Sequence, residues 1–181
     1  AKVQGVTQFV YNMPNGTGRG SSIVGFQVRR VTFTPTDTEP FMAEISAAGN
    51  TTYKDENGDS PDWIEVYNPT GSTVDLTGWH LTNLEAQPNR RTFPAVTLAR
   101  GARLVVFASA KNRAVAGARL HTDFKLPAAG SYLALTKPDG TAVHSFAPYP
   151  AQTDGFSYGV NGLSRSAAAA FLYPATPDGA N

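Results

Sequence analysis

The sequence predicts an all-β protein, built as an antiparallel β-sandwich with an additional β-hairpin at its N-terminal end. Short runs of β-branched and aromatic residues recur along the chain, and Gly, Pro, Asn and Asp residues bound each run. Of the 181 residues, 41% are hydrophobic, which is enough apolar surface for one core. Helical patterns are confined to two short segments. We therefore expect one sandwich domain with extensions.

The first expected element is a hairpin within residues 1–40. Residues 6–11 and 23–33 have strand character, and in the second run Val24, Phe26 and Val28 alternate with more polar positions. The Gly-rich connection 14–21 tolerates turn dihedrals. This hairpin would extend the sandwich, complete a neighbouring domain or pair with another chain.

The strands of the sandwich are expected within residues 41–158, and turn residues separate them. Two turns are especially clear: residues 68–71 contain Asn, Pro and Gly, and residues 137–140 place Pro and Gly for a tight reversal. The predicted strands are residues 41–46, 63–67, 73–81, 92–98, 103–109, 132–137 and 142–146.

The remaining segments complete the predicted organisation. Residues 109–118 and the Ala-rich residues 164–171 are predicted as single short helices, and Ser164 is a candidate N-cap of the second. Residues 159–181 are predicted as a C-terminal tail or linker, because their end is rich in Pro, Ala, Asp and Gly. We expect the chain to be a piece of a longer protein.

Charge and composition exclude several function classes. Fifteen Lys and Arg residues against fourteen Asp and Glu residues give a net charge of +1, which provides no broad field for nucleic acid or anionic lipid. The absence of Cys excludes disulfides, thiolate zinc sites and cysteine nucleophiles. No apolar run approaches the ~18 residues of a membrane helix, so membrane insertion is not expected. Nucleic-acid binding is a lesser alternative, which would require the fold to gather dispersed basic residues: Arg29, Arg30, Arg90, Arg91, Arg100, Arg103, Lys111 and Arg113.

Several motifs follow one another in an order that is specific to one family. They are Asp62-Trp63-Ile64-Glu65-Val66-Tyr67-Asn68-Pro69, Val74-Asp75-Leu76-Thr77-Gly78-Trp79-His80-Leu81, Arg91-Thr92-Phe93-Pro94, the stretch from Leu98 to Phe107, Phe124-Lys125-Leu126, and the stretch from Leu133 to Thr141. In this order they resemble the lamin tail domain over residues 41–158. The opening Asp62-Trp63-Ile64-Glu65 is similar to that of lamin tail domains in bacterial secreted or surface proteins.

The resemblance implies an immunoglobulin-like sandwich and a role in binding. Its motif residues are expected to form the structural core: Trp63, Trp79, Gly78, Phe93 and Phe107. Large aromatic side chains are suitable anchors between sheets, and Gly lets the backbone come close beside Trp79. Both Trp residues are therefore interpreted as core residues and not as ligand platforms.

The acidic loop before Trp63 is the one candidate ion site, with Asp55, Asn57, Asp59 and Asp62 as calcium ligands. Oxygen ligands at alternate positions suit calcium. The loop departs from a helix-loop-helix calcium site, because Ser60 stands at the sixth position, where that site has Gly. A solvated, turn-forming loop without an ion is the alternative. No other cofactor is expected.

Catalysis is not expected from the sequence. Gly155-Phe156-Ser157-Tyr158-Gly159 has the pattern of a hydrolase nucleophile elbow, but no His follows Ser157, so a final strand or turn is predicted there. His80, His121 and His144 lack the spacing of a helical zinc site.

Together these observations predict a non-catalytic binding, adhesion or structural module of a larger protein, extracellular or at the cell surface. The expected partner is a protein or a cell-wall glycan, and the sequence carries no indication of oligomeric state. An accessory domain of an extracellular hydrolase or nuclease is the alternative.

Overall fold

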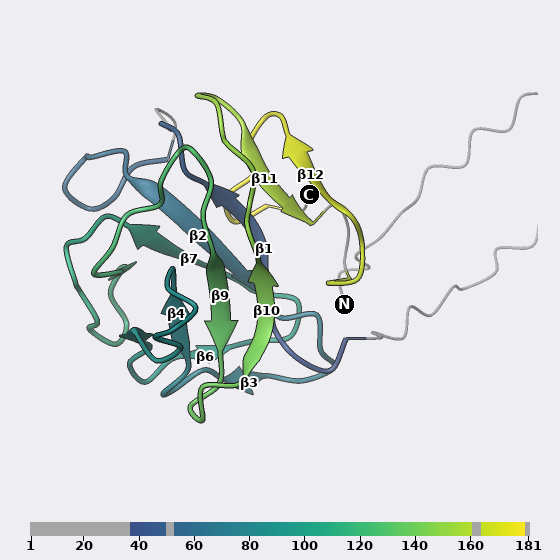
Figure 1. Cartoon of the computed structure of the whole chain (residues 1–181). Helices are drawn as coiled ribbons and strands as arrows, with labels where there is room; N and C mark the ends of the chain where they lie inside the picture. Colours follow the sequence, from purple (N-terminus) through teal and green to yellow (C-terminus); the bar gives the residue numbers. More distant parts are fainter. Residues whose placement is uncertain (1–36, 50–52, 161–163, 180–181) are drawn as a thin grey trace, which may run out of the picture. The chain divides into compact units, whose positions relative to one another are not determined.

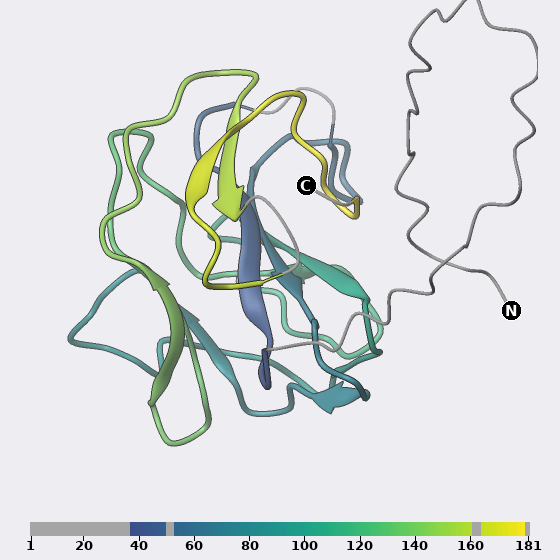
Figure 2. The same cartoon turned by 90° about the vertical axis from the view of Figure 1, so that its right-hand side faces the viewer.

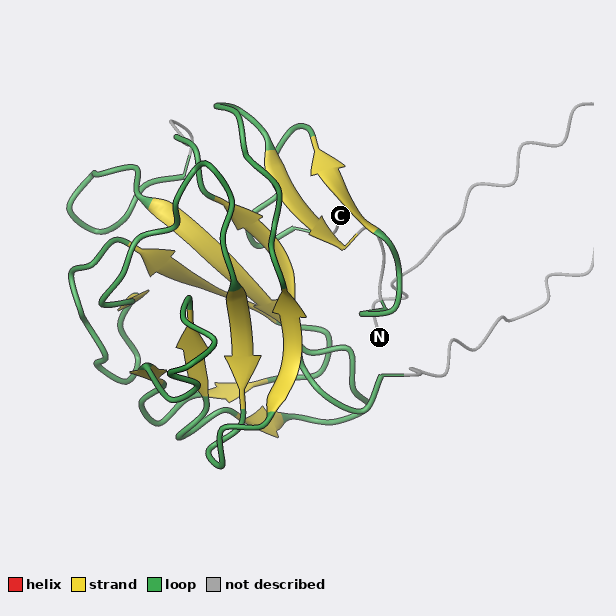
Figure 3. Cartoon of the chain, viewed as in Figure 1, coloured by secondary structure: helices red, strands yellow, loops and turns green. Residues whose placement is uncertain are grey.

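The computed structural model describes residues 37–49, 53–160 and 164–179 (Figure 1). Every regular element in these residues is a strand, so none of them forms a helix that could cross a membrane (Figure 3). The strands are β1 (Phe41–Ser46), β2 (Asp62–Tyr67), β3 (Val74–Asp75), β4 (His80–Thr82), β5 (Arg91–Thr92), β6 (Thr97–Leu98), β7 (Arg103–Ala108), β8 (Leu120–His121), β9 (Leu133–Thr136), β10 (Ala142–Phe146), β11 (Ser157–Val160) and β12 (Ala169–Leu172). The predicted all-β class is confirmed.

The larger sheet contains six strands in the order β12-β11-β1-β2-β7-β8. Its neighbours are antiparallel except for β7 and β8, which are parallel. Alternation along β2 directs Ile64 and Val66 into the main core and leaves Trp63, Glu65 and Tyr67 on the opposite face. We call that opposite face of the sheet the outer face.

The second sheet contains four strands in the order β10-β9-β4-β5, and β3 and β6 form a small separate pair. Figure 1 shows β9 and β10 in front of β2 and β1. Side chains from both larger sheets share one buried cluster, which includes Met42, Ile64, Leu81, Val106 and Leu133. This is the two-layer arrangement of an immunoglobulin-like sandwich, as predicted.

Two expected strands are each divided into two. Within residues 73–81, the Asp75 carboxylate accepts hydrogen bonds from the N–H and hydroxyl of Thr77, and Gly78 has a positive φ of 78°. The resulting turn separates β3 from β4, which belong to different sheets. Residues 92–98 are similarly divided into β5 and β6.

Both predicted helices are wrong. In residues 109–118, Ala110 and Asn112 have positive φ values of 62° and 53°, and their N–H groups donate to carbonyls of residues 124 and 122. In residues 164–171 the Ala-rich stretch leads into β12, which pairs with β11 from Ser157↔Leu172 to Val160↔Ala169. Pairing across the sheet overrides the helix propensity of Ala.

Beyond residue 158 the chain continues to build the sandwich. The segment 159–181, expected to be a tail or linker, contributes the end of β11 and all of β12 to the larger sheet. Gly159 allows β11 to approach β1, because a Cβ there would lie 2.2 Å from the Ala43 carbonyl oxygen. The hairpin predicted for residues 1–40 lies outside the described residues, apart from residues 37–40.

Four of the five predicted core residues are buried, and these four lie on two sides of the larger sheet. The fifth, Gly78, lies in the turn before Trp79 and is only partly buried. Trp79 and Phe93 belong to the main core between the sheets. Trp63 and Phe107 are cross-strand partners and lie on the outer face, where the Tyr53 ring stacks on Phe107 at 5.6 Å. Burial of the outer face therefore requires a cover that is not a second sheet.

Candidate functional site

The acidic loop folds around the carboxylate of Asp55. One oxygen of Asp55 accepts the N–H groups of Asn57 and Asp59 at 2.9 and 3.0 Å, and the Asp55 N–H donates to the Asp59 carbonyl at 2.8 Å. These bonds direct the side-chain oxygens of Asp55, Asn57 and Asp59 toward one point.

That point is the ammonium group of Lys111. Lys111 Nζ bonds to a carboxylate oxygen of Asp55, to Asn57 Oδ1 at 3.2 Å and to Asp59 Oδ2 at 2.7 Å. Although burial raises the pKa of Asp55, the bonds from Lys111 and from two backbone N–H groups hold it below its ordinary value. The hydrogen bonds from Lys111 to Asp55 and Asp59 raise the pKa of Lys111.

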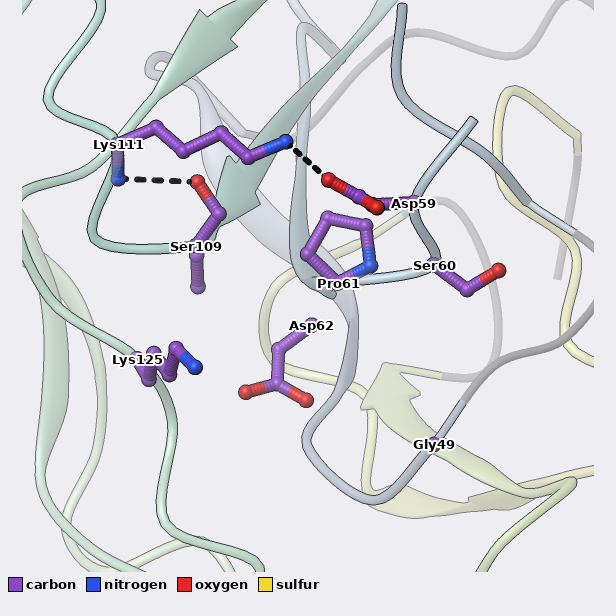
Figure 4. Close-up of a pocket in the computed structure, with 9 residues that line it drawn as sticks. Gly49, Asp59, Ser60, Pro61, Asp62, Ser109, Lys111 and Lys125 are labelled. Atoms are coloured by element: carbon purple, nitrogen blue, oxygen red, sulfur yellow. Dashed lines mark hydrogen bonds and ion pairs between the residues drawn. The ribbon is translucent and has the colours of Figure 1, made fainter. Parts of the chain in front are cut away.

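Asp62, the fourth predicted calcium ligand, lies apart from the other three. Its Oδ2 accepts the Leu126 N–H at 3.2 Å, and burial raises its pKa. Asp62 lines an open cavity of about 360 Å³ together with Asp59, Lys111 and Lys125. In Figure 4 Asp62 and Lys125 lie apart from the Lys111–Asp59 pair. Three of the predicted ligands therefore converge and one does not, and a calcium ion would have to compete with Lys111. Calcium binding stays a prediction.

A second set of contacts connects the acidic loop to residues 109–121. Ser109 Oγ lies 2.8 Å from His121 Nδ1, and His121 Nε2 lies 3.0 Å from Glu56 Oε2. Glu56 also pairs with Arg113, and Asp55, Glu56 and His121 present ligand atoms within 4.8 Å of one another. A bond from its own N–H, followed by the His121 imidazole, lowers the pKa of Glu56 to about 2.

Pairing of this kind involves four of the six basic residues that were considered for nucleic acid and lie in the described part of the chain. Arg90 pairs with Asp123 at 3.3 Å, Arg103 with Glu65 at 2.8 Å, and Lys111 and Arg113 with the acidic loop. Each of these positive charges is compensated locally, which leaves little field for a phosphate backbone.

The outer face of the larger sheet holds a pair of buried carboxylates that the sequence analysis missed. Glu44 in β1 is the direct cross-strand partner of Glu65 in β2, and both are 0% exposed. Arg103 donates to Glu65, and the buried Ser157 hydroxyl donates to Glu44. Burial raises the pKa of Glu65 to about 7. Ser157 is thus a strand residue bound to a carboxylate.

Residues 174–179, which we call the strap, cover this carboxylate pair. Thr176 donates its N–H to Glu44 at 3.0 Å and its hydroxyl at 2.9 Å, and the Asp178 N–H donates to Glu65 at 2.7 Å. The Tyr53 hydroxyl donates to Asp178 Oδ2 at 2.6 Å. In Figure 2 the yellow C-terminal part of the chain, which includes the strap, ends beside the blue loop of residues 53–61.

Exposed aromatic side chains gather beside the strap, on the β11–β12 hairpin. Phe156, Phe171 and Tyr173 are 40%, 49% and 75% exposed, and the rings of Phe156 and Tyr173 are 5.2 Å apart. Strand β12 is the edge of its sheet in the described part of the chain. The helix predicted for residues 164–171 concealed this strand, and so the aromatic edge formed by Phe156, Phe171 and Tyr173 was not foreseen.

Comparisons with known proteins identify the central part of the chain. A family model described as Lamin Tail Domain matches residues 41–149. No curated protein and no solved structure matches the chain. Strands β11 and β12, the aromatic edge and the strap all lie beyond the matched residues.

Proposed function

We propose that this chain, which belongs to the lamin tail domain family, is a binding module of a larger secreted or cell-surface protein. Domains of this family are immunoglobulin-like and are generally non-catalytic binding or structural modules. The observation that carries the proposal is the aromatic edge, because contiguous exposed aromatic side chains are typical of interaction sites.

A protein partner suits this edge better than other classes. An edge strand presents backbone N–H and C=O groups that an extended segment of another protein can pair with. The rings of Phe156 and Phe171 lie next to that edge and offer apolar area for side chains of the added segment. Backbone pairing would supply affinity, and the aromatic contacts would supply specificity.

The binding test compares two pairs of exposed apolar residues. Phe156→Ser and Phe171→Ser change the aromatic edge, whereas Leu84→Ser and Val115→Ser change exposed apolar residues elsewhere. We expect cross-linked capture of a surface protein to fall at least tenfold with the first pair and to stay unchanged with the second. Equal capture by all four variants, each with an unchanged melting temperature, would contradict the proposal.

A glycan partner would give a different pattern. Sugars also bind to exposed aromatic rings, so a glycan array is run with the same variants. If the wild-type chain binds to the array and Phe156→Ser and Phe171→Ser abolish that binding, the proposed partner becomes a glycan instead of a protein.

The secreted or surface location is proposed from Asp62-Trp63-Ile64-Glu65, which resembles the opening motif of bacterial surface proteins. Antibody against this domain should label intact cells that produce the parent protein. Labelling only after permeabilisation would contradict the location.

A further inference from the structure

We infer that the outer face of β1 and β2 is a recognition surface for a Thr-Pro-Asp-Gly turn, which the strap of this same chain supplies. This surface is separate from the aromatic edge, so this inference and the proposed function can fail independently. It assigns a binding role to residues within the family match, which covers residues 41–149, and to residues that follow it.

Glu44 and Glu65 carry a desolvation cost, because both are fully buried. Two adjacent acids with no exposed surface are strongly destabilising unless their oxygens are paired. Arg103 and Ser157 each serve one oxygen, Oε1 of Glu65 and Oε1 of Glu44. Among the described residues, the Oε2 atoms of both acids accept hydrogen bonds only from the strap, at 2.9 Å from the Thr176 hydroxyl and 2.7 Å from the Asp178 N–H. The carboxylate pair is therefore complementary to the strap.

A tight turn fixes the backbone of the strap. Thr176 to Gly179 form a β-turn, closed by a hydrogen bond of 2.8 Å from the Gly179 N–H to the Thr176 carbonyl. Pro177 at the second position fixes φ in advance, and Asp178 at the third has a positive φ of 62°. Pro177 has no N–H that would need a partner. The N–H groups on either side of it, at Thr176 and Asp178, donate to Glu44 and Glu65.

The Asp178 side chain makes a further contact with the outer face. Its carboxylate accepts the Tyr53 hydroxyl, and the Tyr53 ring packs against Trp63 at 6.3 Å and Phe107 at 5.6 Å. Both ends of the turn are thus recognised, one by Glu44 and the other by Tyr53 and Glu65. A peptide with the same turn chemistry would find the same partners if the strap were displaced.

The test measures binding of a labelled peptide to the full chain. The probe is a fluorescein-labelled peptide of residues 172–181, and the control peptide carries Asp178→Pro, which removes the N–H donor and cannot adopt a positive φ. The receptor is the full chain with Thr176→Ala and Asp178→Pro, so that its own strap is released.

We expect the labelled peptide to give saturable anisotropy changes with this receptor. Its binding to wild type should be at least tenfold weaker, because the wild-type strap occupies the surface. Binding of the control peptide to the receptor should also be at least tenfold weaker. No saturable binding to a receptor that still melts cooperatively would overturn the inference, and so would equal binding of both peptides or of both receptors.

A second variant serves if that receptor does not fold. Tyr53→Phe removes one contact of the strap, so the full chain with this substitution should bind the peptide several-fold better than wild type. Unchanged binding would overturn the inference. Adding Phe156→Ser and Phe171→Ser to the receptor should leave peptide binding unchanged.

Discussion

Two acidic regions of this molecule contain similar side chains in opposite environments. In the acidic loop, Glu56 and Arg113 are 38% and 42% exposed in their side chains, so water screens their attraction. On the outer face, Glu65 is fully buried and its partner Arg103 is 10% exposed. Burial, and not the number of acids, therefore decides which region the fold depends on.

Removing one arginine from each region should give the largest difference. Arg103→Ala leaves Glu65 buried without its positive partner and removes the guanidinium lying 4.3 Å from the centre of the Tyr67 ring, so we expect a loss of about 3 kcal/mol or more. Arg113→Ala removes an exposed pair and should cost less than about 1 kcal/mol. Urea unfolding of both variants measures the two values.

Equal losses for the two arginine variants would contradict the comparison. Arg100→Ala is a suitable control, because Arg100 is exposed and the structure gives it no ion pair among the described residues.

The pH dependence of stability should differ between the two regions in sign and in range. Burial raises the pKa of Glu65 from 4.5 to about 7, so the folded chain binds this proton more tightly than the unfolded chain. The free energy of unfolding should therefore fall as pH rises from 4.5 to 7, by roughly 1 to 3 kcal/mol, and Glu65→Gln should remove that slope.

Glu56 gives the matched control for this pH effect. Its pKa is lowered to about 2, so its contribution is present above pH 4.5 and is lost as pH falls toward 2. Glu56→Gln should leave the slope between pH 5 and 7 unchanged. A slope in that range that persists in Glu65→Gln would show that another group causes it.

The difference between the regions also explains what the sequence could reveal. The turn residues around Asp55 and the ordered motifs from Asp62 onward predicted the loop, the sandwich and the family. Glu44 and Glu65 gave no such indication, because acids within strands normally face solvent. Their partners in the strap are also distant in the sequence: Thr176 is 132 residues from Glu44, and Asp178 is 113 residues from Glu65. Contacts over such distances depend on strand order, which local patterns do not encode.

The same limit applies to residues near the acidic loop. Lys111 and His121 are 56 and 65 residues from the acids that they contact, so alternate acidic residues indicated calcium without revealing the ammonium group among them. For the Ala-rich stretch before Phe171, local propensity favoured a helix, and the free edge of β11 determined the outcome.

Salt should change the free-energy cost of the arginine substitutions differently in the two regions, by a smaller amount than pH does. Raising NaCl from about 0.05 to 1 M shortens the screening length to about 3 Å, so the cost of Arg113→Ala should fall by a few tenths of a kcal/mol. The cost of Arg103→Ala should stay the same, because solvent ions do not reach a buried pair. Melting curves at both salt concentrations give the comparison, and a parallel decrease for both variants would argue against burial of the Arg103–Glu65 pair.

Calcium should have the smallest effect on the wild-type chain. The ion and the Lys111 ammonium compete for oxygens of Asp55, Asn57 and Asp59, so we expect wild type to gain less than about 1 °C in melting temperature at millimolar calcium. Lys111→Met should bind calcium about tenfold more tightly in calorimetric titration. Absence of heat in both proteins would leave the acidic loop as a turn without an ion.

Hydrogen exchange at two amides of the strap tests most directly whether the strap closes the outer face. In the full wild-type chain, the Thr176 and Asp178 N–H groups donate to buried carboxylates, so both should exchange slowly, with an opening free energy above about 2 kcal/mol. Exchange of both amides at the rate of an unstructured chain, while amides of β1 and β2 remain protected, would contradict the account.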